Sequence, residues 1–204
     1  MPTPKPSPHA KPRPKTKSGT ATANQKSVTF PATSLPTPAV VHEHALRAPR
    51  FARLFWQSLI SGKRSFGDLI ALSAVERSDL IEQGVPAAML SRLSDRMDVP
   101  KERLYKTLGV KRATVDRKIK DRADLTVEQS EGVVGLTRLI GQVEQIVSES
   151  GHEESFDAAR WVAEFLARRH PALGGRKPED LMRTGDGRSA VATLVAQMQS
   201  GAYT

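Results

Sequence analysis

Histidine and acidic side chains are the groups of this chain that could carry out catalysis or hold a metal ion. His42 and His44 lie two residues apart, and His152 is followed by Glu153 and Glu154. A zinc site needs three or four ligands that converge, and the sequence suggests no third ligand beside either group. No pair of acidic residues is singled out for general acid-base chemistry. We therefore expect no catalysis, no metal site and no cofactor.

Closely spaced glycines near the carboxyl end could cradle a phosphate group or could simply make turns. They are Gly174 with Gly175, and Gly185 with Gly187. A phosphate loop follows a β-strand and carries the Walker spacing, and both features are missing here. The glycines therefore indicate turns.

The residues around these glycines predict three helical segments within residues 151–204. Trp161 and Phe165 lie four apart and share a helix face, and Pro171 cannot continue that helix. Pro178 is suited to the first position of a second helix. A third helix has apolar residues at positions i, i+3, i+4 and i+7, and these are Val191, Leu194, Val195 and Met198. Spacing alone predicts a small helical domain whose glycines and prolines make turns.

Residues 101–120 carry the pattern of a helix-turn-helix. Two short helices would be joined by a tight turn at Leu108-Gly109-Val110. Val115 and Ile119 lie four apart and would hold the second helix against the core. The outward face of this helix would then meet a DNA major groove, and the predicted DNA-binding residues are Lys111, Arg112, Thr114, Arg117 and Lys118. Helical hairpins that do not bind DNA share the same pattern.

The composition of the second helix limits how it could read a base sequence. It contains no Asn or Gln, and Asp116 would repel phosphate if it faced the DNA backbone. Sequence specificity would then be modest, or it would depend on a dimer that binds two half-sites.

The distribution of charge also favours a polyanionic partner. The chain of 204 residues has a net charge of +9 and no cysteine. Residues 1–41 carry six basic residues and no acid, and residues 101–122 carry nine basic and three acidic ones. Residues 123–150 are acidic, whereas residues 151–204 hold seven basic and seven acidic residues. Positive charge is thus concentrated in the amino-terminal tail and the helix-turn-helix.

The remaining segments complete an all-α fold. Residues 1–41 are rich in Pro and Lys and predict a disordered tail. Residues 42–150 form a helical region whose first helices, over 51–83, break near Ser61-Gly62. A capping box at Thr126 and Gln129 starts a long helix with apolar residues three and four apart, which is most simply a core helix and alternatively a coiled dimer interface.

The order of parts in the carboxyl-terminal region resembles the toxin-binding domain of the Xre/MbcA/ParS-like antitoxins. The matching parts are a Trp-bearing helix, P-A-L-G-G-R-K-P-E-D-L-M, T-G-D-G-R and a last helix that closes on S-G-A-Y. The resemblance covers residues 152–204 strongly and the helical region from Gly84 onward more loosely. Residues 1–80 lie outside it.

This resemblance implies an antitoxin that binds a RES-type toxin, which consumes NAD or transfers ADP-ribose from it, and that represses its own operon. Such antitoxins carry an Xre-like helix-turn-helix at this place and bind operator DNA as dimers or higher oligomers. The residues that would shape the toxin-binding surface are Trp161, Leu173, Gly174, Gly175, Arg176, Pro178, Leu181 and Tyr203. Arg176 could pair with acidic or phosphate-bearing groups, and Trp161 could instead belong purely to the core.

An alternative function is that of a stand-alone helix-turn-helix regulator whose carboxyl-terminal domain dimerises or senses a ligand. In either case we expect a cytoplasmic protein. No apolar run approaches the length of a membrane-spanning helix, and residues 1–17 lack the apolar stretch of a secretion signal.

Overall fold

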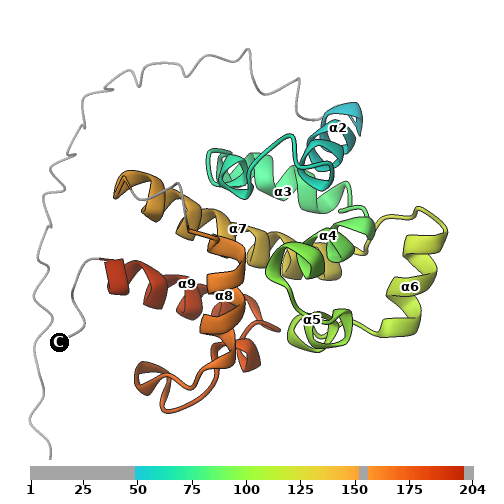
Figure 1. Cartoon of the computed structure of the whole chain (residues 1–204). Helices are drawn as coiled ribbons and strands as arrows, with labels where there is room; N and C mark the ends of the chain where they lie inside the picture. Colours follow the sequence, from blue (N-terminus) through green and yellow to red (C-terminus); the bar gives the residue numbers. More distant parts are fainter. Residues whose placement is uncertain (1–48, 152–155, 200–204) are drawn as a thin grey trace, which may run out of the picture. The chain divides into compact units, whose positions relative to one another are not determined.

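A computed structural model describes residues 49–151 and 156–199, and these residues form helices joined by turns (Figure 1). In chain order the elements are α2 (Pro49–Ile60), the 3-10 helix η1 (Phe66–Leu69), α3 (Ala74–Glu82), α4 (Ala88–Met97), α5 (Lys101–Leu108), α6 (Arg112–Lys120), α7 (Val127–Glu149), α8 (Ala158–Ala167), the 3-10 helices η3 (Pro171–Leu173) and η4 (Pro178–Asp180), and α9 (Gly185–Gln199). The all-α prediction is confirmed for this part of the chain.

Helix α7 begins at the predicted capping box. The Thr126 hydroxyl accepts a hydrogen bond from the backbone N–H of Gln129, and the Gln129 side chain accepts one from the backbone N–H of Thr126. These two bonds satisfy amides that an uncapped helix would leave without partners. The apolar stripe of the sequence is buried along the helix, including Val133, Leu136 and Ile140.

Helix α7 contacts elements from both halves of the chain. It packs against η1, α3, α4 and α5 on the amino-terminal side, and against α8 and α9 on the carboxyl-terminal side. One continuous hydrophobic core results, with buried residues from α2 through α9. The prediction that residues 42–150 and 151–204 are separate domains stays a prediction, but the described parts of both share this core.

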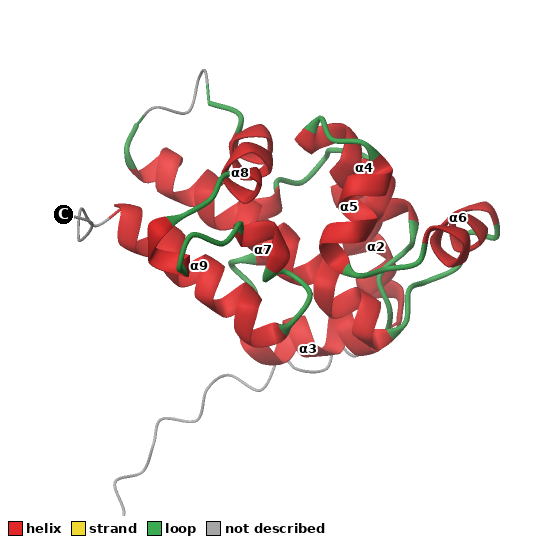
Figure 2. Cartoon of the chain, turned by 90° about the horizontal axis from the view of Figure 1, so that it is seen from below, coloured by secondary structure: helices red, strands yellow, loops and turns green. Residues whose placement is uncertain are grey.

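Helix α6 and the carboxyl-terminal helices α8 and α9 lie far apart in the structure (Figure 1 and Figure 2). In both Figure 1 and Figure 2, α6 lies at one edge of the described residues, while α8 and α9 lie toward the opposite edge. The second helix of the helix-turn-helix therefore faces away from the carboxyl-terminal segment.

The amino-terminal helices confirm the predicted break, and their apolar residues are not all buried. Helix α2 ends at Ile60, next to Ser61-Gly62, as predicted. Phe55 and Leu59 are buried, but Leu54 of α2 and Val75 of α3, which are also apolar, are 65% and 61% exposed. An apolar residue type at a helical position does not by itself say which face the fold covers.

Several sequence-based predictions fall outside the described residues. These are the disordered tail over residues 1–41, the residues His42, His44, His152 and Tyr203, and the helix stop at Gly201.

The glycines of α7 allow a sharp test of this packing. A Cβ added at Gly141 would lie 2.5 Å from the carbonyl oxygen of Phe66, which belongs to the backbone of η1, whereas at Gly132 the nearest atom, in Leu108, lies 3.8 Å away. Gly141→Ala should therefore lower the free energy of unfolding by about 1–3 kcal/mol because the helix and η1 must separate.

Gly132→Ala is the matched control, since it makes the same change in the same buried helix. It should leave stability unchanged or raise it by up to about 1 kcal/mol through helix propensity. Urea denaturation followed by circular dichroism measures both variants. Equal stability of the two would contradict the close contact between α7 and η1.

Candidate functional site

The turn between α5 and α6 has the geometry that the sequence predicts. Gly109 ends α5 in the left-handed conformation, with a φ of 70°. The backbone N–H of Val110 donates to the carbonyl of Tyr105 at 2.9 Å, which closes the last turn of the helix. Leu108 and Val115 are buried, and Val110 and Ile119 pack against the core while partly exposed. Helix α6 is thereby held with one face on the core and the other toward solvent.

The predicted DNA-binding residues differ in how freely α6 presents them. Lys111, Arg112 and Arg117 are exposed, whereas Thr114 and Lys118 are half-buried. The Lys118 ammonium donates to the backbone carbonyl of Asp124 at 2.7 Å and so fastens the end of α6 to the following loop. Among the described residues, no hydrogen bond or ion pair engages the side chains of Lys111 and Arg117. Lys120, which the sequence-based set omitted, is exposed and unengaged in the same way.

Arg112 is held between two carboxylates. Its guanidinium lies 2.8 Å from Glu102 on α5 and 3.3 Å from Asp116 on α6. Asp116 also accepts a hydrogen bond from the Tyr105 hydroxyl at 3.2 Å. Burial of the phenol, together with this hydrogen bond, raises the pKa of Tyr105 to about 12. Asp116, which the sequence suggested would repel phosphate if it faced the DNA backbone, joins α5 to α6, and Arg112 is partly neutralised.

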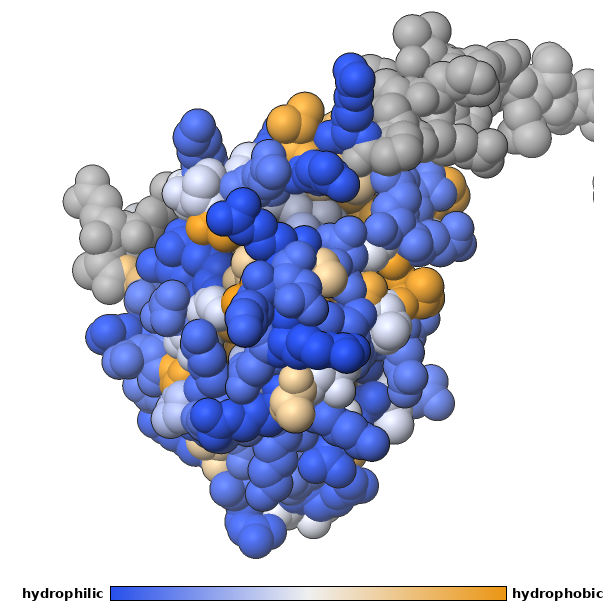
Figure 3. All heavy atoms as spheres, turned by 90° about the vertical axis from the view of Figure 1, so that its right-hand side faces the viewer, coloured by the Kyte–Doolittle hydropathy of each residue, from blue (hydrophilic) through white to orange (hydrophobic). Residues whose placement is uncertain are grey.

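The surface on the α6 side of the molecule is mostly hydrophilic, with small separate apolar patches (Figure 3). Such a face suits a charged partner better than an apolar one. The described surface is thus compatible with DNA at α6.

The segment after α8 forms a small closed loop. His170 donates from its backbone N–H to the carbonyl of Arg176 at 3.0 Å, and Gly175 donates to the carbonyl of His170 at 3.0 Å. Gly174 and Gly175 both have left-handed backbones, with φ of 63° and 74°, and added Cβ atoms would meet no atom within 4 Å. The predicted turn is present and faces open space. We name residues 170–176 the glycine loop.

The helix predicted at Pro178 is shorter than expected. Pro178 does occupy its first position, but η4 is a single 3-10 turn that ends at Asp180. The helix at Pro178 stays short because the residues that follow belong to other parts of the fold. Met182 is buried in the core, and α9 begins at Gly185. Gly185 and Gly187 lie inside the first turn of α9.

The predicted toxin-binding residues are in part surface and in part support. Gly174 and Arg176 are exposed, Leu173, Gly175, Leu181 and Trp161 are half-buried, and Pro178 is buried. The Trp161 ring stacks on Phe165, with centroids 5.2 Å apart, and packs against the core. Phe165 in turn lies 6.0 Å from the His170 ring. A row of aromatic rings thus leads from α8 to the start of the glycine loop.

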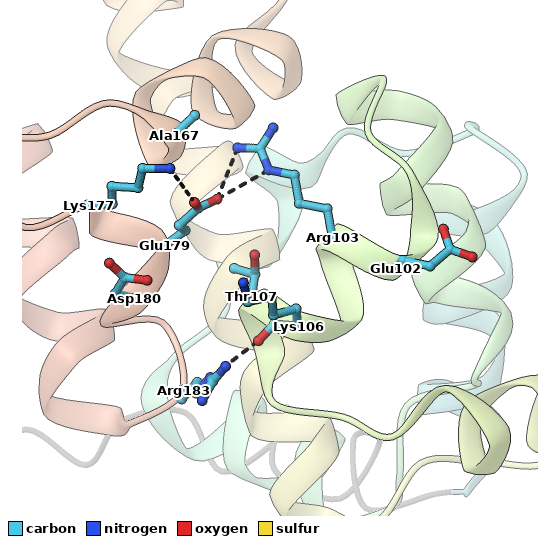
Figure 4. Close-up of a pocket in the computed structure, with 9 residues that line it drawn as sticks. All are labelled: Glu102, Arg103, Lys106, Thr107, Ala167, Lys177, Glu179, Asp180 and Arg183. Atoms are coloured by element: carbon cyan, nitrogen blue, oxygen red, sulfur yellow. Dashed lines mark hydrogen bonds and ion pairs between the residues drawn. The ribbon is translucent and has the colours of Figure 1, made fainter.

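Glu179 is a structural residue that the sequence did not single out. Its carboxylate accepts two hydrogen bonds from Arg103 of α5, at 3.1 and 3.2 Å, and lies 3.3 Å from the Lys177 ammonium (Figure 4). Arg103 also donates to the carbonyl of Ala163 on α8. Arg103, Lys177 and Glu179 line a cavity of about 720 Å³ between α5 and η4. In the sequence, Glu179 is simply an acidic residue that follows Pro178. Nothing in the sequence pattern indicates that it pairs with Arg103, which lies 76 positions away.

Gly187 has a packing role that the turn pattern did not reveal. An added Cβ would lie 2.0 Å from the carbonyl oxygen of Leu181. Any side chain here would push α9 away from the segment that follows η4. The second glycine of T-G-D-G-R is therefore required by close backbone contact.

Metal binding and membrane insertion can both be checked against the described residues. Within the described ranges, no group of three His, Asp or Glu residues could hold a metal ion. Over the same ranges, no helix combines the length and the apolar content that crossing a lipid bilayer would require.

Comparisons with known proteins agree with this arrangement. Residues 76–138 match the antitoxin Xre-like helix-turn-helix domain, and residues 153–201 match the antitoxin Xre/MbcA/ParS C-terminal toxin-binding domain. The chain is also 40% identical to the Prs ADP-ribosylating antitoxin of Sphingobium sp. (strain YBL2) over 135 residues, which are 66% of this chain and 85% of that protein. The chain belongs to the Xre/MbcA/ParS family of antitoxins.

The two matched segments contain the two candidate sites. The first contains the turn at Gly109 and all of α6, and the second contains α8, the glycine loop and α9. Helix α2 lies outside both segments. Family membership supports the antitoxin over the alternative of a stand-alone regulator.

Proposed function

We propose that this antitoxin neutralises a RES-type toxin by binding it directly through the glycine loop, and that it represses its own operon through α6. The observation that carries the proposal is the presence of both family segments in one chain, with α6 at one edge of the described residues and α8 and α9 toward the opposite edge (Figure 1 and Figure 2). A toxin on the glycine loop would then leave α6 open to DNA.

The chemistry of the proposed toxin follows from the relative. The name of the Sphingobium protein refers to ADP-ribosylation. We infer that the toxin bound here transfers ADP-ribose from NAD or consumes NAD. Arg176 is exposed on the glycine loop, and a guanidinium is suited to pair with acidic or phosphate-bearing groups of such a partner.

The proposed site on the antitoxin combines rigid support with backbone access. Trp161 leads through the Phe165 ring to His170 at the start of the glycine loop. Pro178 and Leu181 are buried and half-buried just after the loop, and Gly174 offers a surface without a side chain. A partner could approach the backbone closely there. Tyr203 would contribute from the chain end, as the family resemblance suggests.

For DNA, we propose that Arg117 and Lys111 make the principal contacts from α6, with Lys120 beside them. Thr114 and Lys118 would contact DNA from the half-buried side of the helix, and Arg112 mainly positions α6 through Glu102 and Asp116. The few base-reading groups on one helix favour a dimer or higher oligomer that binds paired half-sites. Such a protein would act in the cytoplasm.

The different engagement of two arginines gives a test of the DNA interface. Arg117→Ala should weaken binding to a duplex from upstream of the antitoxin's own gene by about tenfold, because a free guanidinium contact is lost. Arg112→Ala should have a smaller effect, since its charge is already paired. Fluorescence anisotropy at constant salt measures both. A larger loss for Arg112→Ala would mean that Arg112 leaves its carboxylates to contact DNA.

The toxin interface can be tested at a glycine that faces open space. Gly174→Asn adds a side chain to the glycine loop, and Asn tolerates a left-handed backbone better than most residues. The variant should bind a co-expressed RES-type toxin at least about tenfold more weakly if the toxin packs closely there. Isothermal titration with purified toxin measures the affinity, and rescue of growth gives the cellular readout.

Gly151→Asn is the matched control. Gly151 also has a left-handed backbone, with a φ of 73°, and no atom within 4 Å of an added Cβ, but it lies outside the glycine loop. The affinity of the Gly151→Asn variant for toxin should equal that of the wild type. Equal affinities for both variants would place the toxin elsewhere, and failure of the wild type to bind or rescue would refute the antitoxin–toxin pairing.

A further inference from the structure

A second cavity lies between α2 and the carboxyl end of α6. It has a volume of about 650 Å³ and is lined from three places, namely α2, the α3–α4 connection with the start of α4, and the residues from Ile119 to Asp124. Two chain segments that are far apart in sequence are fixed here by backbone bonds: Ala87 donates to Ala123 at 3.1 Å, and Leu125 donates to Val85 at 2.8 Å. The cavity is thus a built feature of the fold.

Hydrogen-bond donors are concentrated in its lining. Arg53 and Arg122 are exposed, and within the described ranges neither side chain makes a hydrogen bond or ion pair. Trp56 is fully buried, and its indole N–H has no acceptor among the described residues. The amide of Gln57 also lines the cavity. A group with several acceptor oxygens and negative charge would complement this set.

The start of α4 adds to the same preference. Ala88 is the first residue of this ten-residue helix and lines the cavity. Its backbone N–H makes no hydrogen bond with the described residues. The positive end of the helix dipole therefore adds to the attraction that the two guanidinium groups exert on an anion.

One carboxylate opposes these donors. Asp124 lines the cavity, and its backbone carbonyl accepts the bond from Lys118. The charged lining residues are therefore two arginines and one aspartate.

Arg122 occupies a backbone conformation that favours glycine. Its φ is 51°, and a left-handed backbone is unfavourable for a residue with a long side chain. The arginine at this position is one of the two positively charged residues that line the cavity.

We propose that this cavity binds a phosphate of the DNA backbone at the edge of the groove that α6 occupies. The inference rests on DNA binding by α6, and it extends the interface to α2, which lies outside both family segments. Helix α6 has nine residues and is about 13 Å long, close to the roughly 12 Å width of the major groove. With its amino end in the groove, its carboxyl end reaches a flanking phosphate.

The test measures DNA affinity against salt concentration for variants on the full chain. Arg53→Ala and Arg122→Gly each remove one guanidinium, and glycine adopts the observed backbone at residue 122 freely. Each should weaken binding to specific and unrelated duplexes alike, by about fivefold, and reduce the slope of log K against log salt by about one. Asp124→Asn should strengthen binding, since it removes the opposing charge.

Arg138→Ala is the control for loss of one positive charge, since Arg138 is exposed on α7 and lines a different cavity. It should bind DNA like the wild type. Circular dichroism checks that each variant is folded. If Arg122→Gly does not fold, Arg53→Ala and Asp124→Asn still decide the question.

Three outcomes would overturn the inference in distinguishable ways. If the wild type and Arg138→Ala bind DNA, Arg117→Ala weakens binding, and the cavity variants have no effect, then α6 binds DNA but this cavity does not. If inorganic phosphate raises the melting temperature of the wild type but not of the arginine variants, while DNA affinity is unchanged, the cavity binds a free anion instead. If the wild type binds no DNA, the proposed repression fails together with the inference.

Discussion

The burial of α7 is the constraint on which the rest of the antitoxin depends. A helix of 23 residues with an apolar stripe must be covered, and the chain covers it from both halves. Glycine at position 141 lets the backbone of η1 approach closely, and the Thr126 capping box determines where the helix begins. Because α5, α8 and α9 all pack on α7, this one helix sets the positions of the helix-turn-helix and the toxin-binding segment together.

Two kinds of surface remain once α7 is covered. Helix α6 is anchored by Val115 and by the Tyr105–Asp116–Arg112 contacts, and it presents Arg117 outward. The glycine loop is closed by the bond between His170 and Arg176 and is supported by the aromatic row from Trp161. Glu179 and Arg103 join the two regions between α5 and η4 (Figure 4).

Local features of the fold could be predicted from the sequence. The capping box, the turn at Gly109 and the turn at Gly174-Gly175 each involve residues within a few positions of one another, so their residue types determine them. Exposure of Leu54 could not be predicted, because it depends on which helix covers which face. The Arg103–Glu179 pair and the contact of Gly187 with Leu181 depend on tertiary packing, which leaves no periodic pattern. For the same reason, the sequence predicted Arg112 as a DNA-binding residue without indicating that Glu102 pairs with it.

If α6 binds DNA and the glycine loop binds toxin, the antitoxin should hold both partners at once, because α6 lies at one edge of the described residues while α8 and α9 lie toward the opposite edge (Figure 1 and Figure 2). Sedimentation velocity of labelled operator DNA with antitoxin, before and after addition of toxin, tests it most directly. Added toxin should increase the mass of the DNA complex, because both surfaces are filled at once. Release of free DNA at stoichiometric toxin would contradict it, since the two partners would then compete for one surface.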